Sequence, residues 1–161
     1  MTVVEFVPAK HLDRLISQWR NLACNAVEPN PFYLPEFVKH AFAGSTHAGP
    51  SGVLVVRDRQ ASNDKAAIGI WPLSFALPRI RTVPNFVKGL HNPFMSCSVP
   101  LVRAGSERKA ICGFLDWFEE SIGSLGTLHL NEVGLDGAVW IEIRKVLEER
   151  QQSWSIVDEF E

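Results

Sequence analysis

Apolar residues recur at helical spacing in three well-separated segments of this chain. Positions i, i+3, i+4 and i+7 share one face of a helix, so the spacing predicts helices over 12–23, 106–122 and 136–147, the last with Asp136 as N-cap. Another helix is expected from Pro35, which suits a first helical turn, to about Ala43. Short apolar runs predict strands over 3–7, 52–56, 66–77, 98–102, 126–131 and 154–157.

The order of these elements predicts the fold class. The predicted order is β-α-α-β-β-β-α-β-α-β, in which the strands over 52–56 and 66–77 pair as a hairpin and residues 79–87 are expected to continue that antiparallel meander. Strands and helices alternate in the second half. This order favours an α/β fold with a mixed sheet and helices on both faces. Pro72 predicts a bulge or an edge position in its strand. No internal boundary is visible, so residues 1–161 are expected to form a single domain.

Composition excludes several classes of function. Hydrophobic residues make up 46% of the chain and the formal net charge is −2. This balance argues against disorder and gives no electrostatic reason to expect a nucleic acid or an anionic membrane as partner. The three cysteines include no CxxC pair, so we expect no disulfide framework, which is typical of a protein in a reducing cytoplasm. No signal peptide and no membrane-spanning run of apolar residues is visible, so we expect a cytoplasmic protein.

The junction between the strand at 98–102 and the following helix is a candidate phosphate site. Arg103, Gly105 and Ser106 lie there. Amides at a helix N-terminus are unsatisfied, and the helix dipole favours an anion beside them. The alternative is an ordinary helix start with Ser106 as N-cap, because Glu107 would satisfy the dipole itself and repel a phosphate.

A second candidate is the loop that holds His91 and Asn92. A loop histidine titrates near neutral pH and can act as a general base beside a cleft. The alternative is a turn in which Phe94 anchors the loop to the core. The other histidines have no metal-ligand spacing, and there is no GxSxG or P-loop motif. We therefore expect no metal site and no hydrolase or nucleotide-triphosphatase activity.

Four segments carry a family resemblance: Trp19 in the first helix, the loop from Pro29 to Phe37, the strand from Ile68 to Leu73, and the run from Pro100 to Arg103. Together they resemble the N-terminal half of the CelD/BcsL-type acetyltransferases. That group is linked to cellulose biosynthesis, belongs to the GNAT superfamily and is related to FemABX-like enzymes with two GNAT-like halves. The resemblance covers nearly the whole chain.

The resemblance implies a GNAT acyl-CoA N-acyltransferase fold, with acetyl-CoA as cofactor and a small molecule or sugar as acceptor. Such a site needs two splayed parallel strands for the pantetheine arm and a loop of the pattern Gln/Arg-x-x-Gly-x-Gly/Ala for the pyrophosphate. Arg103 and Gly105 match that loop only in part, because the spacing differs and one glycine is missing.

Members of the group usually have a second half, which is associated with the acyl-CoA chemistry. The resemblance therefore implies that this chain is a supporting first half, paired with a second GNAT-like half or with another copy as a homodimer. Two alternatives stay open: a complete small acetyltransferase that acts on an amine or a sugar hydroxyl, and a non-catalytic interaction module with a GNAT-like fold.

Overall fold

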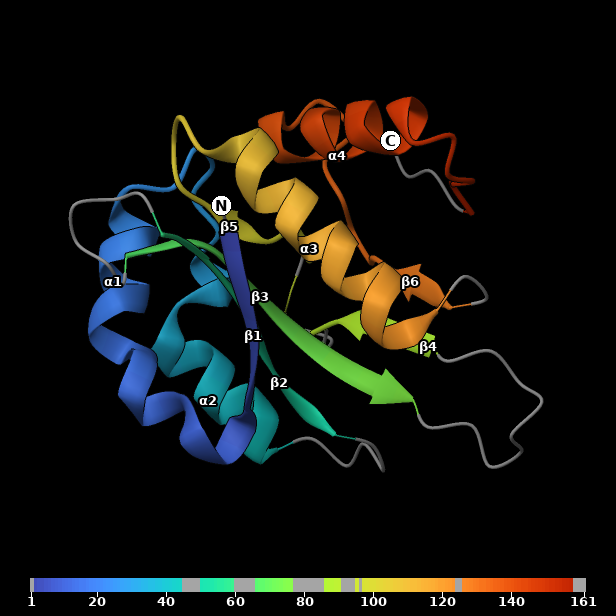
Figure 1. Ribbon diagram of the computed structural model, residues 1–161. Coiled ribbons are helices and arrows are strands. Elements are labelled where there is room, and N and C mark those ends of the chain that lie inside the picture. Colours follow the sequence, from blue (N-terminus) through green and yellow to red (C-terminus); the bar gives the residue numbers. More distant parts are fainter. Residues whose placement is uncertain are drawn as a thin grey trace.

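The computed structural model describes residues 2–44, 50–59, 66–76, 86–90, 95, 97–123 and 126–157. A six-stranded sheet forms the centre of this part of the chain (Figure 1). Its strands are β1 (Thr2–Pro8), β2 (Ser51–Asp58), β3 (Ala67–Ala76), β4 (Phe86–Gly89), β5 (Leu101–Val102) and β6 (Thr127–His129). The order is β1-β2-β3-β4-β6, and β5 pairs with β3 beside β4. All pairs are antiparallel except β4 and β6, which are parallel. The predicted mixed sheet is confirmed.

Helices cover both faces of the sheet, as predicted. The short 3-10 helix η1 (Ala9–Leu15) leads into α1 (Ile16–Cys24), and η2 (Pro31–Tyr33) leads into α2 (Pro35–Ala43). Figure 1 shows α1 and α2 on one side of the sheet and α3 (Glu107–Ile122) on the other. Helix α4 (Ala138–Glu149) packs against α3. No helix in the described ranges has the length and apolar character needed to cross a membrane.

Close packing between β3 and α3 fixes the position of the long helix. The ring of Trp71 meets that of Phe114 edge to face, with centroids 5.2 Å apart. Gly69 lies directly under the same phenylalanine, and a Cβ at that position would come within 2.8 Å of the ring. A glycine is therefore needed there so that α3 can approach the sheet this closely.

Pro72 is neither at a bulge nor at the edge of the sheet. Strand β3 is central, and its register shift lies between Val56 and Arg57 of the partner strand. The carbonyl of Pro72 accepts a hydrogen bond from Leu90 N at 2.9 Å. The amide that proline lacks would face the same residue, and Leu90 O instead accepts a hydrogen bond from the Tyr33 hydroxyl at 3.1 Å.

The C-terminal elements differ from the prediction in two ways. Helix α4 begins after Gly137 rather than with Asp136 as its N-cap. The segment Trp154–Val157 is not a strand, and it is exposed beside α4, where Trp154 contacts Trp140. Its apolar residues have the strand pattern, but none of the strands in the described part of the chain pairs with them. The predicted strand over 98–102 is also shorter, since only Leu101 and Val102 pair. Residues 79–85 of the expected meander lie outside the described part of the chain.

Candidate functional site

The candidate phosphate loop forms one tight turn between β5 and α3. Gly105 has a φ of +79°, a left-handed conformation that glycine adopts readily. Ser106 N donates to Arg103 O at 3.0 Å, which closes the turn. Ser106 is the N-cap residue of α3, as the alternative interpretation expected, although its side chain makes no capping hydrogen bond.

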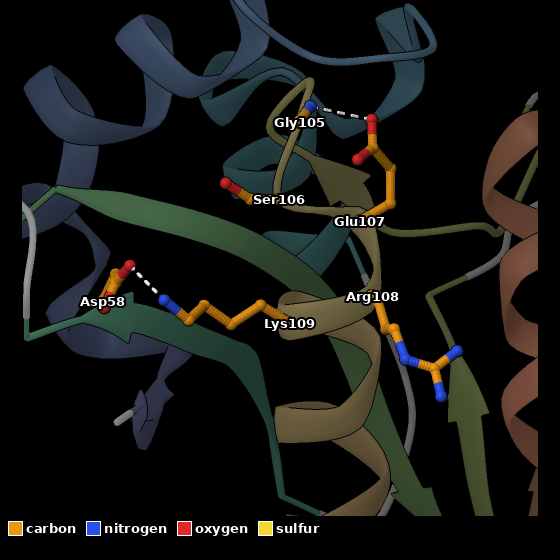
Figure 2. Close-up of a pocket in the computed structure, with 6 residues that line it drawn as sticks. All are labelled: Asp58, Gly105, Ser106, Glu107, Arg108 and Lys109. Atoms are coloured by element: carbon orange, nitrogen blue, oxygen red, sulfur yellow. Dashed lines mark hydrogen bonds and ion pairs between the residues drawn. The ribbon is translucent and has the colours of Figure 1, made fainter.

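A shallow hollow of about 350 Å³ lies beside this turn. It is lined by Asp58, Gly105, Ser106, Glu107, Arg108 and Lys109 (Figure 2). The hollow therefore contains two of the three predicted cofactor residues, Gly105 and Ser106.

The charged groups of the hollow are already paired within the chain. Glu107 accepts a hydrogen bond from Gly105 N at 2.9 Å, and Lys109 Nζ bonds Asp58 at 2.6 Å (Figure 2). Arg108 points away from Lys109 toward α4, where it bonds Glu142 at 3.3 Å and Glu149. Its hydrogen bond holds the pKa of the Glu149 carboxyl below the ordinary value. A phosphate would have to displace a carboxylate from the loop amide.

Arg103 does not face the hollow. Its guanidinium bonds Asn21 Oδ1 at 2.8 Å and Ala67 O at 3.3 Å, so it joins α1 to β3. Gly105 and Ser106 therefore line the hollow together, whereas the side chain of Arg103 is directed to other partners. His91 and Asn92 lie outside the described residues. The described ranges contain no group of three potential metal ligands.

The free edge of β5 is occupied by the chain itself. Arg103 N bonds Ile68 O of β3 on one side of this strand. On the opposite side, Val27 N donates to Val102 O at 2.8 Å and Ala104 N donates to Asn25 O at 3.0 Å. We call residues Asn25–Asn30, which connect α1 to η2, the strap. The strap pairs with the edge of β5 that faces away from β3.

Buried side chains extend this pairing past the end of β5. Asn30 is 4% exposed, and its amide nitrogen donates to Val99 O at 3.1 Å and Cys97 O at 3.3 Å. The Tyr33 hydroxyl donates to Ser98 O, and the indole of Trp71 donates to the same carbonyl. Burial raises the pKa of Tyr33 well above the ordinary value for a phenol. The carbonyls of 97–99 are thus satisfied from inside the protein.

The other side of the strap meets the start of α4. The Glu28 carboxylate accepts hydrogen bonds from Ala138 N and Val139 N, and so caps the helix from a distant part of the chain. A Cβ on Gly137 would come within 2.6 Å of this carboxylate. Ser98 Oγ donates to Asn131 O. The strap therefore fills the space between β5 and the segment that leads from β6 to α4.

Comparison with solved structures identifies this architecture. No family model matches the sequence, and no curated protein matches it. The structure is similar to that of a ribosomal-protein-alanine N-acetyltransferase from Brucella melitensis biovar Abortus 2308, with a TM-score of 0.50 and 13% identity. That alignment covers 99% of this chain and 96% of the other.

The chain has the GNAT fold. A second solved structure, an integron cassette protein from the mobile metagenome of V. cholerae, is similar with a TM-score of 0.47 and 14% identity, over 99% of this chain and 90% of that one.

The residues present do not fit acetyl-CoA in the way that the GNAT fold implies. A pantetheine arm would need the edge of β5, which the strap occupies through Val27 and Asn25. A pyrophosphate would need the loop amides, and Glu107 already bonds one of them.

The strap is the feature that sequence reasoning missed. The three prolines at 29, 31 and 35 predict a rigid loop, and that property is local. The partners of Glu28 and Asn30 are 110 and 69 positions away. Nothing in the residues themselves points to those partners.

Proposed function

We propose that this chain is a GNAT-like unit that supports an acyltransferase without holding acetyl-CoA in its own slot. The observation that carries the proposal is the strap, which pairs with the edge of β5 and caps α4. A cofactor bound between these elements would have to replace hydrogen bonds that the chain already makes. The loop before α3 adds a second obstacle, since its carboxylate opposes a phosphate.

Calorimetric titration with acetyl-CoA tests this proposal directly. The expected result for the natural chain is no binding tighter than about 1 mM, which corresponds to about 4 kcal/mol of binding free energy. Dissociation constants in the micromolar range would overturn it. Coenzyme A without the acetyl group serves as a control for binding by the nucleotide part alone.

The partner in this proposal is a second GNAT-like unit, either another half of the same enzyme or another copy of this chain. The resemblance to the CelD/BcsL-type acetyltransferases supports the first choice and stays a prediction. Sedimentation velocity tests the second, with a homodimer expected.

A complete small acetyltransferase is the second candidate. One observation favours it: the alignment with the Brucella N-acetyltransferase extends over nearly the full length of both chains. An acetyl group would then pass from acetyl-CoA to an amine or a sugar hydroxyl. Release of coenzyme A in the presence of candidate acceptors, measured by mass spectrometry, would favour this candidate over the supporting unit.

A further inference from the structure

The segment that follows α4 is apolar and yet exposed to solvent. We call residues 153–157 the arm. All five residues are exposed, and Trp154, Ile156 and Val157 are three of the five large apolar side chains that are exposed in the described part of the chain. Trp154 meets the ring of Trp140 in α4 edge to face, with centroids 5.7 Å apart. Exposed apolar groups gathered in one short segment are typical of a surface that binds a partner.

The arm has the side-chain pattern of a strand without the pairing of one. Trp154 and Ile156 are two positions apart, so they would project from one face of an extended chain. Within the described residues, no backbone amide of the arm donates a hydrogen bond. The arm leaves the end of α4 at a fixed point (Figure 1), because Gln152 N donates to Leu147 O at 2.9 Å. Its backbone groups are therefore available to a neighbouring strand.

The two edges of the sheet differ in how well they are protected against pairing. At one edge, β1 contains Pro8 and a central carboxylate, Glu5, which bonds Arg57 at 2.9 Å. Prolines and charged side chains keep an edge strand from adding another strand. At the other edge, β6 contains no proline and no Asp, Glu, Lys or Arg. Among the described strands it pairs with β4 alone, so its outer edge is the one that can accept a further strand.

We propose that the arm of one copy adds to the outer edge of β6 in a second copy, and that the exchange is reciprocal. This inference rests on the proposed function, which names another copy of this chain as one of two partners. Each copy has one arm and one open edge, so two equal contacts close a two-fold dimer. Within one copy the arm is held beside α4 by Gln152 and Trp154 rather than at β6.

The side chains of the two segments match. Leu128 and Leu130 are two positions apart, and both are partly buried against the core. Trp154 and Ile156 of an added arm would continue this apolar row across the new strand. The exchange would therefore cover exposed apolar groups of the arm and pair the backbone of β6 at the same time.

Hydrogen exchange at two protein concentrations gives the first test, because an arm that binds a second copy is protected only in the dimer. Sedimentation velocity sets the two concentrations, one on each side of the dissociation constant. At the higher concentration, exchange at the arm amides that face β6 and at residues 127–130 is expected to slow at least about tenfold.

Three results would overturn the inference. Protection of the arm that is already complete at the lower concentration would mean that it pairs within its own chain. A dimer whose arm stays unprotected would use another interface. A chain that stays monomeric up to its solubility limit would exclude the exchange altogether.

An arm variant gives the second test. The side chain of Ile156 is 46% exposed, so Ile156→Lys should leave the fold of a single copy intact. In the dimer the lysine would lie beside the row of Leu128, where an unpaired charge is costly. The dissociation constant of the dimer is expected to rise at least about tenfold.

Leu34→Lys is the matched control for the arm variant. It replaces another exposed apolar side chain, 40% exposed, at the start of α2. This variant should dimerise as the natural chain does, and urea unfolding should show that both variants are folded. Equal dissociation constants for Ile156→Lys and Leu34→Lys would contradict the proposed contact.

The outcomes separate this inference from the proposed function. Micromolar binding of acetyl-CoA by the natural chain would overturn the supporting role, whatever the arm does. A dimer that is unaffected by Ile156→Lys and has an unprotected arm would overturn the exchange alone. If Ile156→Lys does not fold, hydrogen exchange of the natural chain decides the question.

Discussion

Asn30→Asp should destabilise the chain by a large and pH-dependent amount. The substitution keeps the shape of the side chain and the oxygen that accepts a hydrogen bond from Phe32 N at 3.1 Å. It replaces the amide nitrogen, which donates to Val99 O and Cys97 O, with a second oxygen. Two donor–acceptor contacts thus become contacts between acceptors in a site that is 4% exposed.

The magnitude follows from those two bonds. Each buried hydrogen bond contributes about 0.5–1.5 kcal/mol, and a buried group left without a partner costs about 1–3 kcal/mol. We expect a loss of about 3 kcal/mol in the free energy of unfolding at pH 7. For a chain of this size, that corresponds to a fall in Tm of about 6–12 °C.

The pH dependence has a definite sign. Burial against two carbonyls should raise the pKa of the new aspartate in the folded state, and the protonated acid can donate to one of them. The loss in the free energy of unfolding should therefore be small below about pH 4, which is near the ordinary pKa of aspartate. It should grow as the pH rises above that value.

Urea unfolding followed by circular dichroism at pH 7 and pH 4 measures this effect, with the natural chain at each pH as reference. Asn25→Asp is the matched control. Asn25 is exposed and makes one side-chain bond, to Asn21 O at 2.7 Å. The assignment of the Asn30 amide as a buried donor would be refuted in either of two cases. In the first, Asn30→Asp lowers the free energy of unfolding no more than Asn25→Asp does. In the second, its effect does not change with pH.

Three further predictions concern the core. Trp19→Phe should cost about 1–3 kcal/mol by leaving Tyr33 O without its indole donor, as measured by urea unfolding. Gly69→Ala should cost a similar amount through its clash with Phe114, and Phe114→Leu in the same chain should recover part of the loss if that clash is the cause. Tyr33 is the single tyrosine of the sequence, so the rise in absorbance at 295 nm with pH, which tyrosinate formation causes, reports its ionisation. Because burial raises its pKa in the folded state, its ionisation should be delayed well past pH 10, and stability should fall as the pH rises above 10. A titration near pH 10 in folded protein would contradict its burial.

The fold could be predicted from the sequence because its signals are local and periodic. The stripe that contains Phe114 and Phe118 repeats at helical spacing, and both residues are buried against Trp71 in the structure. The antiparallel pairing of β2 with β3 follows from the short connection between them, whereas β1 pairs with β2 across two intervening α-helices. Trp154–Val157 marks the limit of such reasoning, because its apolar pattern suits a strand that has no partner.

The candidate site was predicted only in part, for a physical reason. Gly105 and Ser106 line the hollow, and their turn could be predicted because a junction between a strand and a helix has a local signature; their role in binding a cofactor stays a prediction. The direction of the Arg103 side chain depends on Asn21 and Ala67, which are distant in sequence. A guanidinium can bond several kinds of acceptor, so the presence of an arginine does not by itself predict which acceptors it binds.

The carboxylate of Glu28 has a consequence for the way the chain is made. Its partners, Ala138 and Val139, lie more than 100 positions later in the sequence. Synthesis runs from the N-terminus, and contacts between distant residues form late in folding. Residues 25–30 can therefore reach their final position only after α4 has left the ribosome. Helix α4 thus fixes the position of a segment that is synthesised more than 100 residues before it.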